Sequence, residues 1–173
     1  MAETTEFEKL VADHYEPLYQ FAFSLTRDEA DSCDLVQQTF YIWANKGHQL
    51  RDVTKVKTWL FTTLHREFLS ACRKRSRFLH VELDQAAEEL PMVSPPAVSQ
   101  LDATQVLAAL AKLDDIYQAP VALFYLQDNS YNEIAAILEV PLGTVKSRLA
   151  RGLAHLHRML TGEKIELHKP KQL

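Results

Sequence analysis

The chain has 173 residues, of which 47% are hydrophobic and 24% are charged, and its formal net charge is −4. This composition is typical of a globular protein and excludes collagen-like, low-complexity and disordered chains. The longest apolar run is Ala119–Leu126, and the first residues are acidic, so we expect neither a membrane span nor a secretory signal. The isolated cysteines Cys33 and Cys72 fit a reducing cytoplasm and form no thiolate zinc motif.

Apolar residues recur at three- and four-residue steps through most of the chain, which predicts helices and no sheet. The first stripe, Phe7–Leu25, is one helix or a pair divided near Pro17. A second helix begins at the acids of 28–31 and ends near Gly47. After a polar loop at about 48–56, a third helix runs from about Lys57 to Arg77.

The periodicity stops at residues 81–100, which contain three prolines behind a run of acids. This composition predicts a flexible linker between two small helical domains. Beyond it, Val106, Leu110 and Leu113 indicate one helix, and Asp114 and Asp115 can cap the next. The predicted plan of this all-α chain is a first domain at 1–80, a linker at 81–100, a second domain at 101–160 and a frayed tail at 161–173.

Charge is distributed along the chain in blocks. Residues 1–48 have a net charge of −6, residues 49–80 of +6, residues 81–102 of −5 and residues 129–158 of +2. Such blocks suggest two anion-binding surfaces separated by an acidic segment. For charge blocks taken alone, ordinary solvated helix faces are the plainer interpretation.

The most specific pattern lies in the second domain. Residues 130–133, Ser-Tyr-Asn-Glu, form a capping box in which the first and fourth residues satisfy each other's backbone amides. A short amphipathic helix, a tight turn at 139–141 and a longer helix from Thr144 to Leu160 follow. This is the plan of a helix-turn-helix, whose second helix can enter the major groove with basic and hydroxyl side chains. The alternative is a plain helical hairpin with a solvated basic face.

The basic block beside the third helix is a second candidate nucleic-acid site. Its cations can track phosphates, and side chains of the preceding loop can hold an unstacked base. Taken alone it is a weak signal, because many helices end in Lys and Arg and a single Trp is more often a core residue. The members of this set are His48, Gln49, Arg51, Lys57, Trp59, Arg66, Arg73, Lys74, Arg75 and Arg77.

Three parts of the chain resemble extracytoplasmic-function (ECF) sigma factors, in the family's order and spacing. One resembles the region 2 helix that binds the polymerase clamp, one the promoter-melting helix, and one region 4. The resemblance runs from about Phe7 to Leu160. The matching segments are 34–40 (Asp-Leu-Val-Gln-Gln-Thr-Phe) with Trp43, 58–61 (Thr-Trp-Leu-Phe) with 73–75 (Arg-Lys-Arg), and 130–135 with 141–149.

The sequence also departs from the family pattern at several positions. Cys33 and Gln38 stand where acids are common, and Glu139 replaces a frequent turn glycine, which would strain the backbone if that residue is left-handed. Arg66 and Ser70 occupy positions that are often Asn and Asp. These departures concern clamp affinity and promoter choice.

The resemblance implies a cytoplasmic initiation subunit of bacterial RNA polymerase that is not an enzyme and uses no cofactor or metal. The first domain would dock on the clamp, the basic set would open the minus-ten element, and the second domain would bind the flap and the minus-thirty-five element. The acidic linker would pass near the active-site cleft. The implied clamp residues are Asp34, Leu35, Gln37, Gln38 and Tyr41, and the implied minus-thirty-five residues are Thr144, Lys146, Ser147, Arg148 and Arg151.

The expected partners are core RNA polymerase, promoter DNA and an anti-sigma factor, with phosphorylation of Ser32 or Thr39 as a second means of control. A one-component helix-turn-helix regulator is the alternative function, but it would need an effector pocket or a dimer helix. A metal-dependent enzyme is a further rival. It is disfavoured because His155 and His157 are two residues apart, whereas helical ligand pairs need three or four. Co-purification with core polymerase would discriminate among these functions.

Overall fold

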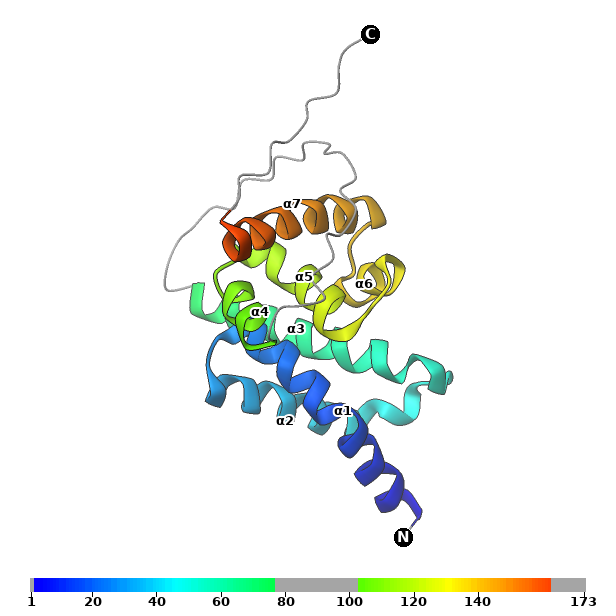
Figure 1. The fold of residues 1–173 in the computed structure, drawn as a ribbon. Helices are drawn as coiled ribbons and strands as arrows, with labels where there is room; N and C mark the ends of the chain where they lie inside the picture. Colours follow the sequence, from blue (N-terminus) through cyan, green and yellow to red (C-terminus); the bar gives the residue numbers. More distant parts are fainter. Residues whose placement is uncertain (1, 77–102, 163–173) are drawn as a thin grey trace.

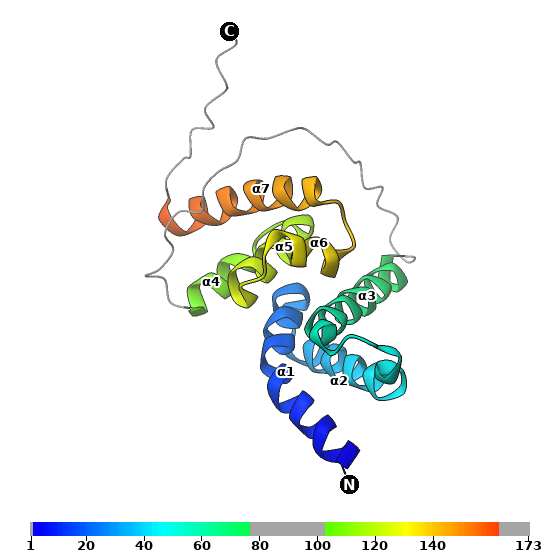
Figure 2. The ribbon, with the colours of Figure 1, turned by 90° about the vertical axis from the view of Figure 1, so that its right-hand side faces the viewer.

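The computed structural model describes residues 2–76 and 103–162, and all regular structure in these ranges is helical. The helices form two groups, α1–α3 and α4–α7, which lie against each other (Figures 1 and 2). The elements are α1 (Ala2–Thr26), α2 (Glu29–Lys46), η1 (Gly47–Gln49), η2 (Val53–Lys55), α3 (Val56–Ser76), α4 (Ala103–Leu110), α5 (Asp115–Gln127), α6 (Tyr131–Leu138) and α7 (Leu142–Thr161).

The observed helices follow the predicted ones with three differences. The first stripe is one continuous helix, because α1 passes through Pro17 without a break. The predicted polar loop contains two 3-10 turns, η1 and η2. Helix α7 starts at Leu142 behind Pro141, and it includes Thr161, which was assigned to the tail. The linker 81–100, Arg77 and residues 163–173 lie outside the described residues.

Local side-chain hydrogen bonds determine where two of the helices start. At α2, the Asp28 carboxylate accepts from the Asp31 amide at 2.9 Å. At α6, the predicted capping box is confirmed: the Ser130 amide donates to Glu133 Oε2 at 2.7 Å, and the Glu133 amide donates to Ser130 Oγ at 3.3 Å. The hydrogen bonds from Ser130 lower the pKa of the Glu133 carboxyl.

Each helix group encloses buried apolar side chains. In the first group Phe21 of α1 packs on Phe61 of α3, with ring centroids 5.4 Å apart. In the second group α5 and α7 approach closely at Gly152, where an added Cβ would lie 2.5 Å from Val121 Cγ2. The groups also contact each other, α1 against α5 and α3 against α6, so that the buried residues form one continuous cluster.

Candidate nucleic-acid interface

An open cleft of about 260 Å³ lies between the end of α2, η1 and the middle of α3. Three residues of the predicted minus-ten set converge on it, namely Gln49, Trp59 and Arg66. An aromatic ring, an amide and a guanidinium around one cleft can stack on an unpaired base and hold its polar edge and phosphate. The remaining lining residues are Ile42, Lys46, Thr63 and Glu67.

These four lining residues were missed by the sequence analysis. Helical spacing carries a signal for some of them, since Trp59, Thr63 and Arg66 are four and three residues apart and therefore share a face of α3. Ile42 and Lys46 are likewise four residues apart on α2. Their meeting with α3 depends on the packing of the two helices.

Trp59 is both a cleft wall and a packing residue. Its half-buried ring meets Trp43 of α2 edge to face, with centroids 5.1 Å apart. Gly47 of η1 lies against the same Trp43 ring, where an added Cβ would be 2.6 Å from two ring atoms. The close approach of η1 to α2 therefore helps to hold the Trp43 ring, against which the Trp59 ring packs.

The other described members of the basic set lie outside this cleft. His48 and Arg51 are exposed on the turns after α2. Lys57 points toward the second helix group, where its Nζ donates to the Gln127 carbonyl at 3.2 Å and lies 5.9 Å from the Phe61 ring centroid.

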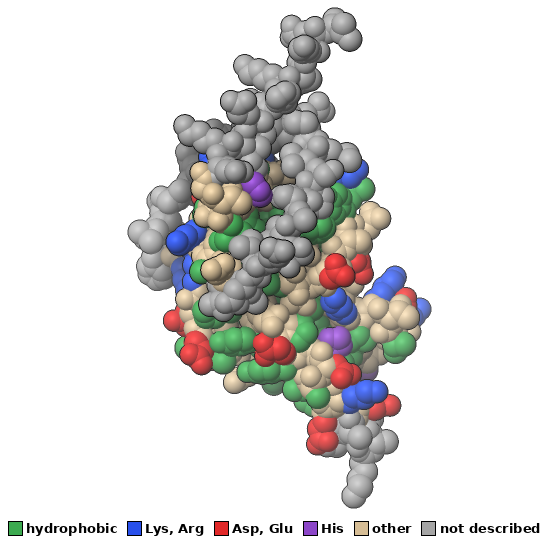
Figure 3. Space-filling model, in the orientation of Figure 1, with side chains coloured by type: hydrophobic (Ala, Val, Ile, Leu, Met, Phe, Trp, Pro, Cys, Tyr) green, Lys and Arg blue, Asp and Glu red, His purple; other side chains and the backbone are tan. Residues whose placement is uncertain are grey.

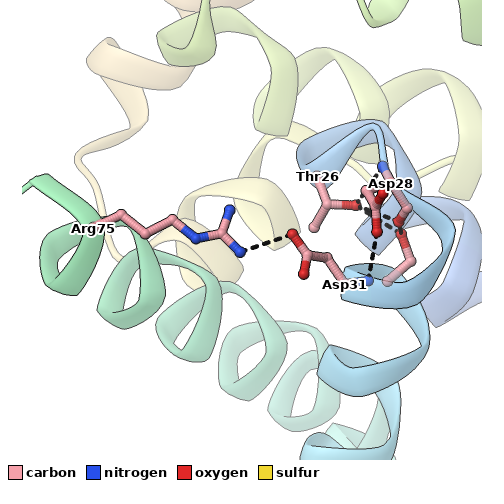
Figure 4. Close-up of polar contacts among 5 residues, drawn as sticks. Thr26, Asp28, Asp31 and Arg75 are labelled. Carbon is pink, nitrogen blue, oxygen red and sulfur yellow. Dashed lines mark hydrogen bonds and ion pairs between the residues drawn. The ribbon is translucent and has the colours of Figure 1, made fainter.

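Arg73, Lys74 and Arg75 stand in the exposed last turn of α3. Figure 4 shows Arg75 reaching from α3 to Asp31 of α2, where Nη2 donates to Oδ2 at 2.8 Å. In residues 2–76 and 103–162, Arg73 and Lys74 have no ion pair, so their charges are available to a phosphate backbone. On the face shown in Figure 3, basic and acidic side chains are interspersed.

A second cleft, of about 290 Å³, separates α2 from the end of α3. Its α2 wall includes Asp34, Leu35 and Gln38 of the predicted clamp set, and its α3 wall includes Lys74 and Arg75. The other two clamp residues, Gln37 and Tyr41, are exposed on α2 outside this cleft, and Tyr41 is 66% exposed.

The predicted phosphorylation of Ser32 or Thr39 is wrong for the folded chain. Both side chains have an exposed fraction of 0%. The Ser32 hydroxyl bonds to the Asp28 carbonyl and to the Thr26 hydroxyl, and the Thr39 hydroxyl donates to the Leu35 carbonyl at 2.7 Å. A kinase could reach neither oxygen without unfolding the start of α2 or its middle.

The helix-turn-helix consists of α6, a turn and α7. The apolar residues Val145 and Leu149 of α7 are buried, while Lys146 is exposed. The other members of the predicted minus-thirty-five set are half-buried, and Arg151 has a bonding partner within the described part of the chain. The half-buried members are Thr144, Ser147, Arg148 and Arg151.

The beginning of α7 lies near α3. Burial, together with the nearby charge of Arg148, lowers the pKa of His65 on α3 to about 4, although Glu139 opposes this shift. An imidazole with this pKa is neutral at pH 7. The charge of Arg148, a predicted DNA-binding side chain, therefore lies close enough to His65 of the first helix group to influence its pKa.

Glu139, in the turn before α7, bonds to Arg66. Glu139 is left-handed, with φ 56° and ψ 41°, which is the condition under which the sequence analysis expected backbone strain. Arg66 Nε donates to Glu139 Oε2 at 2.8 Å, and Arg66 Nη2 donates to Oε1. These bonds lower the pKa of the Glu139 carboxyl and raise that of the Arg66 guanidinium. Two positions that depart from the family pattern are thus partners.

Two further observations concern only the described part of the chain. There, no group of three or more His, Cys, Asp and Glu side chains is arranged to hold a metal ion. Within the same residues, no helix combines the length and apolar character that a bilayer span requires.

In comparisons with known proteins, both helix groups match known families. Residues 10–78 match the family described as sigma-70 region 2, and residues 103–156 match sigma-70, region 4. The chain is 32% identical over 164 residues to the ECF RNA polymerase sigma factor SigE of Mycolicibacterium smegmatis, covering 92% of this chain and 63% of that protein. It is 30% identical to the ECF RNA polymerase sigma factor EcfG of Rhodopseudomonas palustris, covering 83% and 78%.

Two solved structures share the fold. One is the sigma factor RpoE in complex with the anti-sigma factor NepR from Bartonella quintana, with a TM-score of 0.71, 30% identity, and coverage of 90% of this chain and 96% of that one. The other is CnrH in complex with the cytosolic domain of CnrY, with a TM-score of 0.66, 25% identity, and coverage of 92% and 90%.

Proposed function

Because this chain belongs to the family of ECF RNA polymerase sigma factors, we propose that it recruits bacterial core RNA polymerase to specific promoters and opens them. The observation that carries the proposal is the cleft formed by Gln49, Trp59 and Arg66 beside an α3 helix whose last turn carries the exposed cations Arg73 and Lys74. In this proposal the chain acts in the cytoplasm by binding polymerase and DNA, and it catalyses no reaction itself.

In the minus-ten step, the cleft takes a base that leaves the duplex. The base stacks on the Trp59 ring, and Gln49 hydrogen-bonds its polar edge. Base-aromatic stacking is worth about 1–3 kcal/mol per base, which offsets part of the cost of unstacking. Arg73 and Lys74 hold the adjacent phosphates by charge, which keeps the separated strand along α3.

In the minus-thirty-five step, the first two turns of α7 enter the major groove. The hydroxyl and cationic groups for this contact come from Thr144, Lys146, Ser147, Arg148 and Arg151.

The polymerase clamp binds the exposed side of α2. Asp34 and Gln38 lie there near Leu35, and Gln37 and Tyr41 extend the surface.

Both solved relatives are complexes with a partner: NepR, named an anti-sigma factor, in one and the cytosolic domain of CnrY in the other. We propose that an anti-sigma factor also controls this chain, by binding the two helix groups in a form that polymerase cannot use. Phosphorylation of Ser32 or Thr39 plays no part, since both are buried.

Run-off transcription with core polymerase on a random promoter library tests the function directly. The chain should bind core and produce transcripts from a subset of promoters that share minus-ten and minus-thirty-five sequences. Gln49→Ala should alter the base preference at one minus-ten position. Val53→Ala is the matched control, because Val53 is 78% exposed on the next turn and does not line the cleft. Absence of both core binding and transcription would overturn the proposal.

A further inference from the structure

The pairing of Arg66 with Glu139 joins a cleft wall to the turn of the helix-turn-helix. The guanidinium uses two donors, Nε and Nη2, toward the two oxygens of one carboxylate. This two-pronged pairing is the same geometry by which arginine binds a phosphate. The Glu139 carboxylate therefore occupies the donors that a DNA phosphate at the rim of the cleft would need.

The backbone at Glu139 has a conformation that residues with a Cβ atom disfavour. Its φ of 56° is in the left-handed region, where glycine is favoured. The turn itself needs only a left-handed residue to end α6, and a glycine would supply it. What a glutamate adds at this position is the carboxylate that reaches Arg66.

Other polar contacts also join the helix groups: Arg27 Nη2 donates to the Leu113 carbonyl at 3.1 Å and lies 3.5 Å from Asp115 Oδ1. Lys57 Nζ donates to the Gln127 carbonyl, and Gln127 Nε2 donates to the Pro17 carbonyl, each at 3.2 Å. Two cations predicted to bind DNA, Lys57 and Arg66, thus have partners in the second helix group. An exposed ion pair is a weak interaction that salt or a competing anion can replace.

We propose that Glu139 acts as an internal competitor of DNA phosphate for Arg66, so that in the free chain a closure of the two helix groups withholds this guanidinium from the minus-ten cleft. Separation of the helix groups frees the Arg66 donors from Glu139 and moves the start of α7 away from α3 in the same movement. The proposal rests on the proposed function for the role of Arg66 on promoter DNA, whereas the closure concerns the chain alone.

The test compares Glu139→Gly with Asp128→Gly in the full chain without polymerase. Asp128 is also an exposed, left-handed helix C-cap, with φ 52°, and its carboxylate has no partner among residues 2–76 and 103–162. Both variants therefore remove one negative charge and one left-handed side chain, and both should fold. Only Glu139→Gly frees Arg66.

The first measurement is the affinity for a fluorescent single-stranded DNA of mixed sequence, about 20 nucleotides long, at low salt. Glu139→Gly should bind about two- to fivefold more tightly than Asp128→Gly, the range expected for loss of one exposed ion pair. Small-angle scattering should show a larger radius of gyration for Glu139→Gly only. Equal affinities and equal radii for the two variants would overturn the proposal.

A second set of variants tests whether the effect passes through Arg66. In the Arg66→Gln background, Glu139→Gly should give no further gain in DNA affinity. The exchanged pair Arg66→Glu with Glu139→Arg should restore the compact radius that either single change enlarges. A gain that persists without Arg66 would overturn the assignment.

These readouts separate the two proposals. If the chain fails to support transcription but Glu139→Gly still changes compactness and DNA affinity through Arg66, the proposed function fails and the closure stands. If transcription is supported and the two glycine variants behave alike, the function stands and the closure is refuted.

Discussion

Trp43 of α2 and Trp59 of α3 meet edge to face, with ring centroids 5.1 Å apart and ring planes at 78°. Trp59 also lines the cleft, so the position of its ring depends on how Trp43 is held. Behind Trp43 lies the buried Gly47, whose lack of a side chain allows η1 to approach. Packing at the end of α2 is thereby linked to the shape of the proposed base-binding cleft.

Gly47→Ala should therefore lower the free energy of unfolding. The added Cβ would lie 2.6 Å from the Trp43 ring, and overpacking of this kind costs about 1–3 kcal/mol. Urea unfolding of the full chain measures the loss. Gly143→Ala in the first turn of α7 is the control, since nothing lies within 4 Å of its added Cβ. Equal stability of the two variants would show that the Trp43 ring moves aside freely.

Stability should decrease as the pH falls below about 6.5. His65 has a pKa of about 4 in the folded chain, mainly through burial, against an ordinary value of 6.5. Between these values the unfolded chain binds the proton and the folded chain does not, so acid favours unfolding until the pH reaches about 4. Arg148 adds to this shift and Glu139 opposes it.

Urea unfolding at pH 7, 6 and 5 measures this dependence. His65→Gln should flatten it, whereas His48→Gln, on the exposed turn η1, should leave the slope as in the wild type. Burial also lowers the pKa of His14, which acts in the same direction and remains in both variants. An unchanged slope in His65→Gln would mean that His65 is hydrated in solution.

Arg148→Ala and Arg151→Ala should each weaken binding of double-stranded minus-thirty-five DNA while the fold is retained. If the lost contact is to a phosphate, the slope of log affinity against log salt concentration should fall in magnitude by about one unit. If the lost contact is to a base, the free-energy difference between the correct and an incorrect base sequence should fall by roughly 1–3 kcal/mol. Fluorescence anisotropy over a salt series measures both. Arg158→Ala, exposed near the other end of α7, removes the same charge and should leave affinity unchanged. Normal affinity in both test variants would show that Arg148 and Arg151 do not contact this DNA.

Reversal of Arg73 and Lys74 to Glu should block promoter opening more than polymerase binding. Both cations are exposed at the end of α3, and Arg75 is left intact so that its bond to Asp31 persists. Permanganate footprinting of the minus-ten region measures opening. The control reverses the exposed Lys9 and Lys112, which changes net charge equally. Normal footprints in the test variant would make Arg73 and Lys74 ordinary solvated cations.

Gln38→Glu should tighten binding to core polymerase by up to about 1 kcal/mol. The resemblance to the family implies an acid at this position and a basic partner surface, and an exposed pair contributes in this range. Adding Cys33→Glu should extend the effect. Titration of labelled core against each variant measures it, with Ala44→Glu as a control that adds a charge to an exposed site on the same helix. Equal affinity of Gln38→Glu and the wild type would show that the missing acid is neutral.

Much of the fold was determined by local sequence. Apolar spacing predicted the helices, and the 130–133 capping box predicted the start of α6, because these signals act over three or four residues. The same local reasoning predicted the tight turn at 139–141, and the resemblance to the family identified residue 139 as a position where glycine is frequent. In each case the interacting groups belong to one helix or to its ends, so no knowledge of packing was needed.

Only the tertiary structure decided which side chains from different helices meet. Arg66 and Glu139 are 73 residues apart, and Lys57 and Gln127 are 70 apart, so no helical period relates them. The burial of Ser32 and Thr39 also follows from how α2 packs, and the sequence alone had suggested accessible hydroxyls. Crossing angles and the resulting contacts arise from the fit of many side chains at once, and a single local pattern does not specify them.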